Sequence, residues 1–300
     1  MNRKDLLQDV SLNPVKIIPG RRVVSMTPGE WTSPFIGKGF ETRGFRDFEL
    51  GDDPRAVHLS TSVRRGIPTV VERVALRDLT IMIILDLSPS MLVRDKFDMQ
   101  MIAAALLLFS AWKAETTFGL AIHDGEYISS FGCSIGTRHF YKLYNKLWQV
   151  YSSEGSDRSG VARNMHLRRS FSQNSIMFFC SDFLDSGGEL VDVVQLWRQT
   201  HRYDFIPVVV QDEFEFTFPV INSGTFLGLN NPETGVRNEL WISKSDSEEI
   251  REINESRFQS LIELFNKNNT FSIHIIKTDI HEAAMNFIKF FEERKRRGAR

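Results

Sequence analysis

Five apolar runs of strand length alternate with helical patterns along this chain, and this alternation constrains the fold more than any other feature. In the helical patterns, apolar residues share one face, as residues 97, 101, 102, 105, 106 and 109 do. Further stripes of this kind lie at 140–147, 190–197, 258–265 and 284–291. Strands that alternate with helices predict an α/β fold, a mainly parallel sheet with helices on both faces. The apolar runs are residues 81–85, 118–122, 176–180, 205–210 and 271–276.

Two regions interrupt this alternation. Residues 1–78 contain prolines, glycines and short β-like pieces such as 69–74, which predicts a β-rich N-terminal extension before an α/β domain at 79–296. Turn signals at 231–232 (NP) and 234–235 (TG) predict a β insertion at 213–249. Residues 126–131 alternate in polarity after the turn His123-Asp124-Gly125, so we expect an antiparallel edge strand there.

Composition narrows the possible partners and location. The chain has 37 basic and 38 acidic residues and a net charge of −1, which gives no general attraction for nucleic acid. No apolar run approaches the roughly 20 residues of a membrane helix. Cys133 and Cys180 fit neither a disulfide framework nor a zinc site, so we expect a cytoplasmic protein. The basic end ERKRRGAR fits a solvated helix terminus, and contact with a membrane surface, such as the inner membrane, or with nucleic acid is the alternative.

The run 81–85 leads into the pattern Asp-x-Ser-x-Ser, formed by Asp86, Ser88 and Ser90. Alternate side chains of an extended segment point the same way, so these three oxygens can converge at a strand end. A carboxylate and two hydroxyls suit a hard cation such as Mg²⁺. Ser181 and Asp182 follow a second buried run and can complete a partly open site. The competing interpretation is a simple helix or turn cap.

The stretch LDLSPSM resembles the metal-ion-dependent adhesion site of von Willebrand factor A domains. The preceding stretch GFETRGFRDFELGDDPRAVHLSTSVRRGIPTVVERV is similar to the signature of the bacterial "domain of unknown function 58" family, as are FFCSDFLD, PETG and FFEERKRR downstream. The resemblance implies a von Willebrand factor A-like fold with a bound Mg²⁺, or Mn²⁺, and no enzymatic activity. It also implies an adaptor role in protein assembly or maturation beside a MoxR-type AAA+ ATPase, with a partner's Asp or Glu completing the metal site.

Under this resemblance, Asp86, Ser88 and Ser90 form the first metal loop and Asp182 is the distal carboxylate. The family's middle ligand is a Thr, and this chain has none at that place. Ser156 or Ser159 could replace the hydroxyl, and we favour Ser159. The missing Thr leaves open a structural scaffold whose metal site is vestigial.

The family signature Gly51, Asp52, Asp53, Pro54 and Arg55 contains two turn-forming pairs, Gly-Asp and Asp-Pro. A salt-bridged turn that locks the extension to the domain is the favoured interpretation. A partner-binding role is the alternative.

The stretch GCSIG at 132–136 fits the Gly-x-Ser-x-Gly elbow of α/β-hydrolases, with Ser134 as nucleophile. Asp182 and then His201, His274 or His281 follow in the required chain order. The strand before it is short and alternating, however, and no oxyanion loop precedes it. A turn is therefore favoured over a serine hydrolase.

Overall fold

The chain forms two compact units, Met1–Arg22 with Thr80–Arg300, and Val23–Leu79. The smaller unit is inserted into the sequence of the larger one. The computed structural model describes residues 2–17, 41–48, 57–74, 80–123, 128–152, 175–184, 203–230, 237–268 and 270–298.

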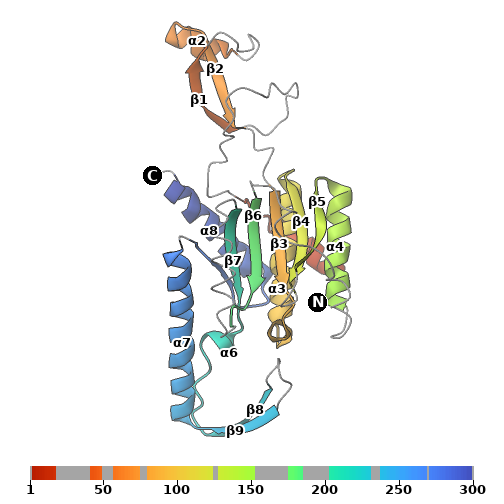
Figure 1. Cartoon of the computed structure of the whole chain (residues 1–300), viewed down its shortest axis with the longest axis vertical. Coiled ribbons are helices and arrows are strands. Elements are labelled where there is room, and N and C mark those ends of the chain that lie inside the picture. The colour runs from red at the N-terminus through yellow and green to blue at the C-terminus, as the bar shows by residue number, and fades with distance from the viewer. Residues whose placement is uncertain are drawn as a thin grey trace. The chain divides into compact units, whose positions relative to one another are not determined.

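The described part of the smaller unit is a β-hairpin with one short helix (Figure 1). Strands β1 (Glu41–Asp47) and β2 (Thr69–Val74) pair antiparallel, and α2 (Leu59–Arg65) precedes β2. Gly66 ends α2 with a left-handed φ of 71°, which glycine adopts without steric cost. An ion pair of 3.6 Å joins Arg65 to Asp47.

In the described residues, the larger unit has a central sheet of six strands in the order β10-β7-β6-β3-β4-β5. Neighbouring strands are parallel except β4 and β5, which pair antiparallel. The predicted α/β class and the predicted edge strand after residue 125 are confirmed. The strands are β3 (Thr80–Asp86), β4 (Thr117–His123), β5 (Ile128–Ser134), β6 (Ser175–Ser181), β7 (Tyr203–Val210) and β10 (Ile273–Ile275).

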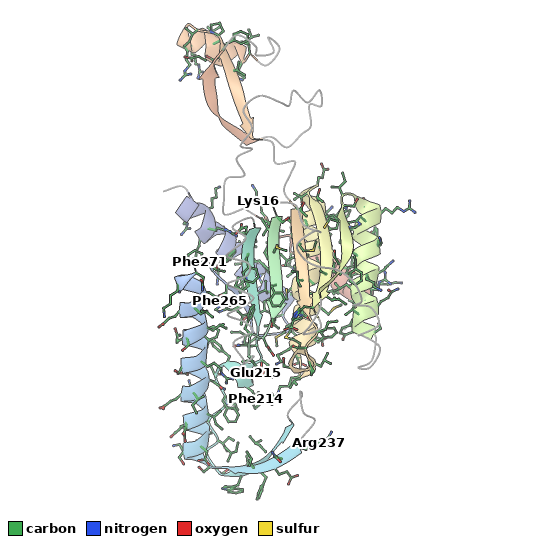
Figure 2. The ribbon with its side chains drawn as sticks, viewed as in Figure 1. Lys16, Phe214, Glu215, Arg237, Phe265 and Phe271 are labelled. Atoms are coloured by element: carbon green, nitrogen blue, oxygen red, sulfur yellow. The ribbon has the colours of Figure 1, made fainter. Side chains whose placement is uncertain are left out.

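Every residue of β3 and β6 is buried, which explains why both read as unbroken apolar runs. Helix α3 (Lys96–Lys113) packs on one face of the sheet and contacts α1 (Arg3–Leu12), α4 (Thr137–Ser152) and α8 (Ile280–Gly298). On the other face, α7 (Lys244–Lys267) packs Phe258, Leu261 and Phe265 against a cluster that includes Met82 and Ile84 of β3 (Figures 1 and 2). The predicted helical stripe at 190–197 lies outside the described residues.

The predicted extension of residues 1–78 does not form one β-rich unit, because its first residues are helical. Leu6 and Val10 of α1 are buried, and the Tyr144 hydroxyl donates to the Arg3 carbonyl at 2.8 Å. The backbone amide of Val15 donates to the buried Ser110 hydroxyl of α3 at 3.2 Å. The N-terminal segment thus belongs to the larger unit.

The predicted β insertion contains the expected hairpin, β8 (Thr225–Asn230) paired with β9 (Arg237–Ile242). Its predicted ends are helical instead. Capping boxes at Asp212 and Ser243 start the short helix α6 (Glu213–Phe216) and helix α7, so hydrogen bonds at these caps override a strand assignment. The last sheet strand is also shorter than the apolar run, because Phe271 precedes β10 and is 43% exposed.

No helix among the described residues is long and apolar enough to cross a lipid bilayer.

Candidate functional site

Polar side chains of neighbouring strands meet at the carboxyl edge of the sheet. If the six strands are numbered by their order in the chain, their order across the sheet from β5 to β10 is 3-2-1-4-5-6. The strand order reverses between β3 and β6, which is therefore the topological switch point. Open α/β sheets bind ligands outside the carboxyl ends of the strands at such a switch point. Asp86 ends β3 and Ser181 ends β6. The predicted motif therefore lies where this kind of sheet binds ligands.

Asp86 is buried, and both of its carboxylate oxygens accept hydrogen bonds. Oδ2 accepts from the Ser181 hydroxyl at 2.6 Å, and Oδ1 accepts from the Ser88 backbone amide at 2.9 Å. The hydroxyl oxygens of Ser88 and Ser90 lie 3.1 Å apart. The fold thus brings the Ser181 hydroxyl and the Ser88 backbone to the Asp86 carboxylate, and the Ser88 and Ser90 hydroxyls to each other.

Neighbouring groups stabilise the negative charge of the Asp86 carboxylate. Burial by itself raises the pKa of this carboxyl, because it penalises the charged form. The nearby imidazole of His123, the Ser181 hydroxyl and the Ser88 amide outweigh burial, so the pKa lies below its ordinary value. Asp86 is therefore ionised at neutral pH, which is the state a cation ligand requires.

The side chain of Gln100 in α3 forms hydrogen bonds at the ends of both β3 and β6. Its Nε2 donates to the backbone carbonyl of Asp86 at 3.0 Å and to that of Cys180 at 2.8 Å. The side chain is fully buried, so these bonds are shielded from water. One amide group thereby bonds to both strand ends just beyond the backbone pairing of β3 with β6, which runs to Leu85 and Cys180.

Asp182, the predicted distal carboxylate, is bound to a lysine of the same chain. The Nζ of Lys96, whose side chain is only 1% exposed, lies 2.7 Å from Asp182 Oδ2 and 2.6 Å from Glu215 Oε1. A buried ammonium is tolerated only when paired, and here two carboxylates pair it. Sequence reasoning missed Lys96 because a lysine that opens a helix usually faces solvent.

The carboxylates of Asp86 and Asp182 contact different groups. Side chains alternate along a strand, so Asp86 lies on the same face of β3 as Met82 and Ile84, the face that α7 covers. Asp182 instead binds Lys96, the first residue of α3 on the opposite face. The structure therefore divides the predicted metal residues between an oxygen cluster around Asp86 and an ion-pair cluster around Lys96.

Helix α6 supplies the third member of the ion-pair cluster, Glu215, next to the carboxyl edge of the sheet (Figure 2). Burial raises the pKa of Glu215, and the Lys96 ammonium opposes this shift. The Asp212 side chain caps α6 by accepting from the Glu215 amide at 2.9 Å. Arg94 Nε lies 3.1 Å from Asp212 Oδ2, and its guanidinium stacks 3.5 Å over the Phe214 ring. Ion pairs thus fasten α6 to the start of α3.

Other predicted site residues lie outside the described part of the chain. These are Ser156, Ser159, His201 and the signature Gly51, Asp52, Asp53, Pro54 and Arg55. Their predicted roles therefore stay predictions.

The described residues of the alternative hydrolase site are not brought together. Ser134 is exposed and pairs with Phe118 near the start of β4, so it lies at the amino-terminal end of the parallel strands. Asp182 follows the end of β6, at their carboxyl-terminal end. A seven-residue strand spans roughly 20 Å, which is far beyond hydrogen-bonding reach. His274 lies in β10 and His281 in α8. The glycines of GCSIG have φ angles of 84° and 92°. Gly132 lies within β5 beside an irregularity in the pairing with β4, and Gly136 directly precedes α4, so the motif is the end of an edge strand and its connection to a helix.

The oxygen cluster around Asp86 fits a hard divalent cation in the chemistry of its donors. One ionised carboxylate and neighbouring hydroxyls match the oxygen ligands that Mg²⁺ and Mn²⁺ accept, with water filling the other positions. The described residues contain no group of three or more His, Cys, Asp or Glu side chains arranged to hold a metal.

Comparison with curated proteins found no match. The family model described as "Protein of unknown function DUF58" matches residues 44–260, which include both halves of the switch point and the helix α6. This match covers more than half of the chain, as the resemblance of Gly51–Arg55 and the Asp-x-Ser-x-Ser motif predicts, and the chain belongs to this family.

Proposed function

We propose that this chain is a non-catalytic, metal-dependent protein-binding module of the von Willebrand factor A type. The observation that supports the proposal is the convergence of Asp86, Ser88 and Ser90 with Ser181 at the switch point of the sheet. This is the place where an α/β sheet presents ligands, and the donor set is that of a hard cation.

In this proposal Asp86 supplies the charge of the site, and Ser88 and Ser90 supply neutral oxygens. Asp182 acts through water while paired with Lys96, and Ser159 is the proposed middle ligand. A bound Mg²⁺ would offer an open coordination position to a carboxylate of the partner. Backbone pairing of β3 with β6 and the two bonds of Gln100 hold the strand ends, so that the site is formed before the partner arrives.

The proposed partner is a MoxR-type AAA+ ATPase, or a complex on which such an ATPase acts. The ATPase would supply the energy and this chain the recognition. A cytoplasmic location is part of the proposal, and it is in keeping with two free cysteines, of which Cys180 is buried.

Calorimetric titration with Mg²⁺ tests the proposal, with Asp86→Ala as the test variant and Asp95→Ala as the matched control. Asp95 precedes α3 and is exposed. We expect saturable binding in the wild type and the control and no binding in Asp86→Ala. Affinity for a captured partner should then fall with a chelator and with Asp86→Ala, while circular dichroism stays unchanged. Binding that persists in Asp86→Ala would contradict the proposal.

A structural scaffold with a vestigial metal site is the second candidate, and the Lys96 ion pairs favour it. The ammonium already pairs with Asp182 and Glu215, so Asp182 has a counter-charge without a metal. Absence of binding up to several millimolar Mg²⁺ in both wild type and Asp86→Ala would support the scaffold.

A further inference from the structure

His123 is a third polar residue at the switch point, and the metal-binding motif does not include it. It is the last residue of β4 and pairs in register with Asp86, the last residue of β3. Register partners on parallel strands point to the same face of a sheet, so the imidazole and the carboxylate lie side by side. The ring is mostly buried and packs edge-on against Phe179 at a centroid distance of 5.8 Å.

The nitrogen that faces Asp86 has no hydrogen-bond partner. His123 Nδ1 lies 3.8 Å from Asp86 Oδ1, which is too long for a hydrogen bond. Nδ1 is also shielded from solvent and unpaired among the described residues. The backbone here is well fixed, because the Leu87 amide donates to the His123 carbonyl at 2.7 Å. A buried, unpaired ring nitrogen next to an ionised carboxylate calls for a ligand between them.

The spacing of these two atoms suits one shared metal ion. Two ligand atoms that each lie about 2.1 Å from an ion are roughly 3–4 Å apart, depending on the angle between them. Neutral imidazole is a ligand for first-row transition metals, whereas Mg²⁺ prefers oxygen and water.

We propose that His123 Nδ1 joins Asp86, Ser88 and Ser90 as a ligand of one cation, and that it makes the site select a first-row transition-metal ion over Mg²⁺. This inference rests on the proposed metal site and adds its selectivity. Ser181, bonded to the other oxygen of Asp86, then orients the carboxylate and leaves Oδ1 to face His123.

Mn²⁺ is the best probe, because it resembles Mg²⁺ in charge and oxygen preference, so that a difference in affinity reports the nitrogen ligand. Mn²⁺ also avoids the exposed thiol of Cys133, which would bind softer metals. The full chain would be titrated with Mn²⁺ and, separately, with Mg²⁺, as wild type, His123→Gln, Asp86→Ala and the control His281→Gln. His281 is exposed at the start of α8.

We expect the wild type and His281→Gln to bind Mn²⁺ on the order of tenfold more tightly than Mg²⁺. His123→Gln should bring the two affinities close together, mainly by weakening Mn²⁺. Pulsed electron paramagnetic resonance of Mn²⁺ on the wild-type chain should show ¹⁴N modulation, which ¹⁵N-histidine labelling converts to the ¹⁵N pattern. The labelled wild type keeps the test valid even if His123→Gln folds poorly.

Three outcomes are distinguishable. Nitrogen coupling that depends on Asp86 and His123 supports the inference. Mn²⁺ binding that is lost in Asp86→Ala, but shows no nitrogen coupling and no preference over Mg²⁺, overturns the inference and leaves the proposed metal site standing. Binding that is absent, or unchanged in Asp86→Ala, overturns both.

Discussion

At the scale of single residues, the buried ammonium of Lys96 governs the electrostatics of one side of the site. It is the only cation that contacts Asp182 among the described residues, and a second carboxylate, Glu215, shares it. Taking such a pair out of water is costly, and the pair is stable only while both signs of charge are present. The energetic consequence of removing one partner is therefore large.

Replacing Lys96 by Met should lower the free energy of unfolding by about 3 kcal/mol, because the Asp182 carboxylate stays buried without a cation. Adding Asp182→Asn should recover much of this loss, since the amide needs no counter-charge. Urea unfolding measures both effects. Lys113→Met, at the exposed end of the same helix, is the control, and it should change stability by no more than about 0.5 kcal/mol. Equal effects of the two lysine variants would contradict the assigned role.

His274 in β10 should make stability depend on pH. Burial lowers the pKa of His274 from 6.5 to about 4, and the Ser272 hydroxyl lies 2.7 Å from its Nε2. At pH values between about 4 and 6.5, the His274 imidazole is protonated in the unfolded chain but not in the folded chain. Stability is therefore full above pH 6.5 and is lost as the pH falls toward 4, by on the order of 3 kcal/mol.

His274→Gln should flatten this dependence, measured as the urea midpoint between pH 7 and pH 4. His281→Gln, in an exposed position, should retain the wild-type slope. A slope that is the same in all three proteins would show that other groups cause the acid sensitivity.

The sequence predicted Asp86, Ser88 and Ser90 as a group, because alternate side chains of an extended segment point the same way and a second Ser-Asp pair follows another buried run. It could not predict Lys96 or Gln100. The burial of those side chains depends on Glu215 and on the carbonyls of two strand ends, partners that lie 14 to 119 residues away. Such tertiary pairing leaves no local pattern in a sequence.

At the scale of elements, the strands were predictable because covered parallel strands must be apolar on both faces. The run at 176–180 became β6 with one added residue at each end. The boundaries of α6 and α7 were not predictable from apolar periodicity, because capping side chains rather than apolar residues set them. The stripe at 258–265 marks only the part of α7 that touches the sheet, and the helix begins at Lys244.

The junction of β4 and β5 gives a prediction at this scale. A Cβ atom on Gly119 would lie 2.7 Å from Cys133 Sγ, 2.8 Å from Met82 Cε and 3.0 Å from the Gly132 carbonyl oxygen. Gly119→Ala should therefore destabilise the larger unit by about 1–3 kcal/mol through overpacking.

The matched control for Gly119→Ala is Gly228→Ala, since a Cβ atom there meets open space in a strand. Alanine at that position should be neutral or slightly stabilising, because glycine loses more backbone entropy on folding. Thermal unfolding compares the two variants. A Gly119→Ala protein as stable as the wild type would mean that the β4–β5 pairing is looser than described.

At the scale of the whole molecule, the larger unit is built from two separate stretches of sequence, with the smaller unit between them. Apolar runs predicted the sheet of the larger unit, but they could not assign α1 to it. The contacts of α1 are with residues about a hundred positions away, and short amphipathic helices carry no signal for their partner.

Leu6→Ala should test this assignment. Leu6 is 4% exposed, so truncation should cost about 2–3 kcal/mol of the stability of the larger unit. Leu12→Ala, in the same helix but 72% exposed, should cost less than about 0.5 kcal/mol. Denaturant unfolding followed by tryptophan fluorescence would report mainly the larger unit, because four of the five tryptophans belong to it, Trp148 of α4 among them. A Leu6 variant that behaves like the Leu12 variant would mean that α1 adds no stability to that unit.

The distance in sequence between α1 and α3 also means that α1 is synthesised well before the helix that it contacts. Helix α1 is synthesised before the smaller unit, and α3 is synthesised after it. Ser110 of α3, whose hydroxyl accepts a hydrogen bond from the Val15 amide, follows Val15 by 95 residues. At about 5–20 residues per second, α1 waits for several seconds with Leu6 and Val10 exposed to solvent. The nascent chain therefore passes through a stage in which α1 is complete but lacks the helix that covers it, and a chaperone that binds short apolar helices would meet it there.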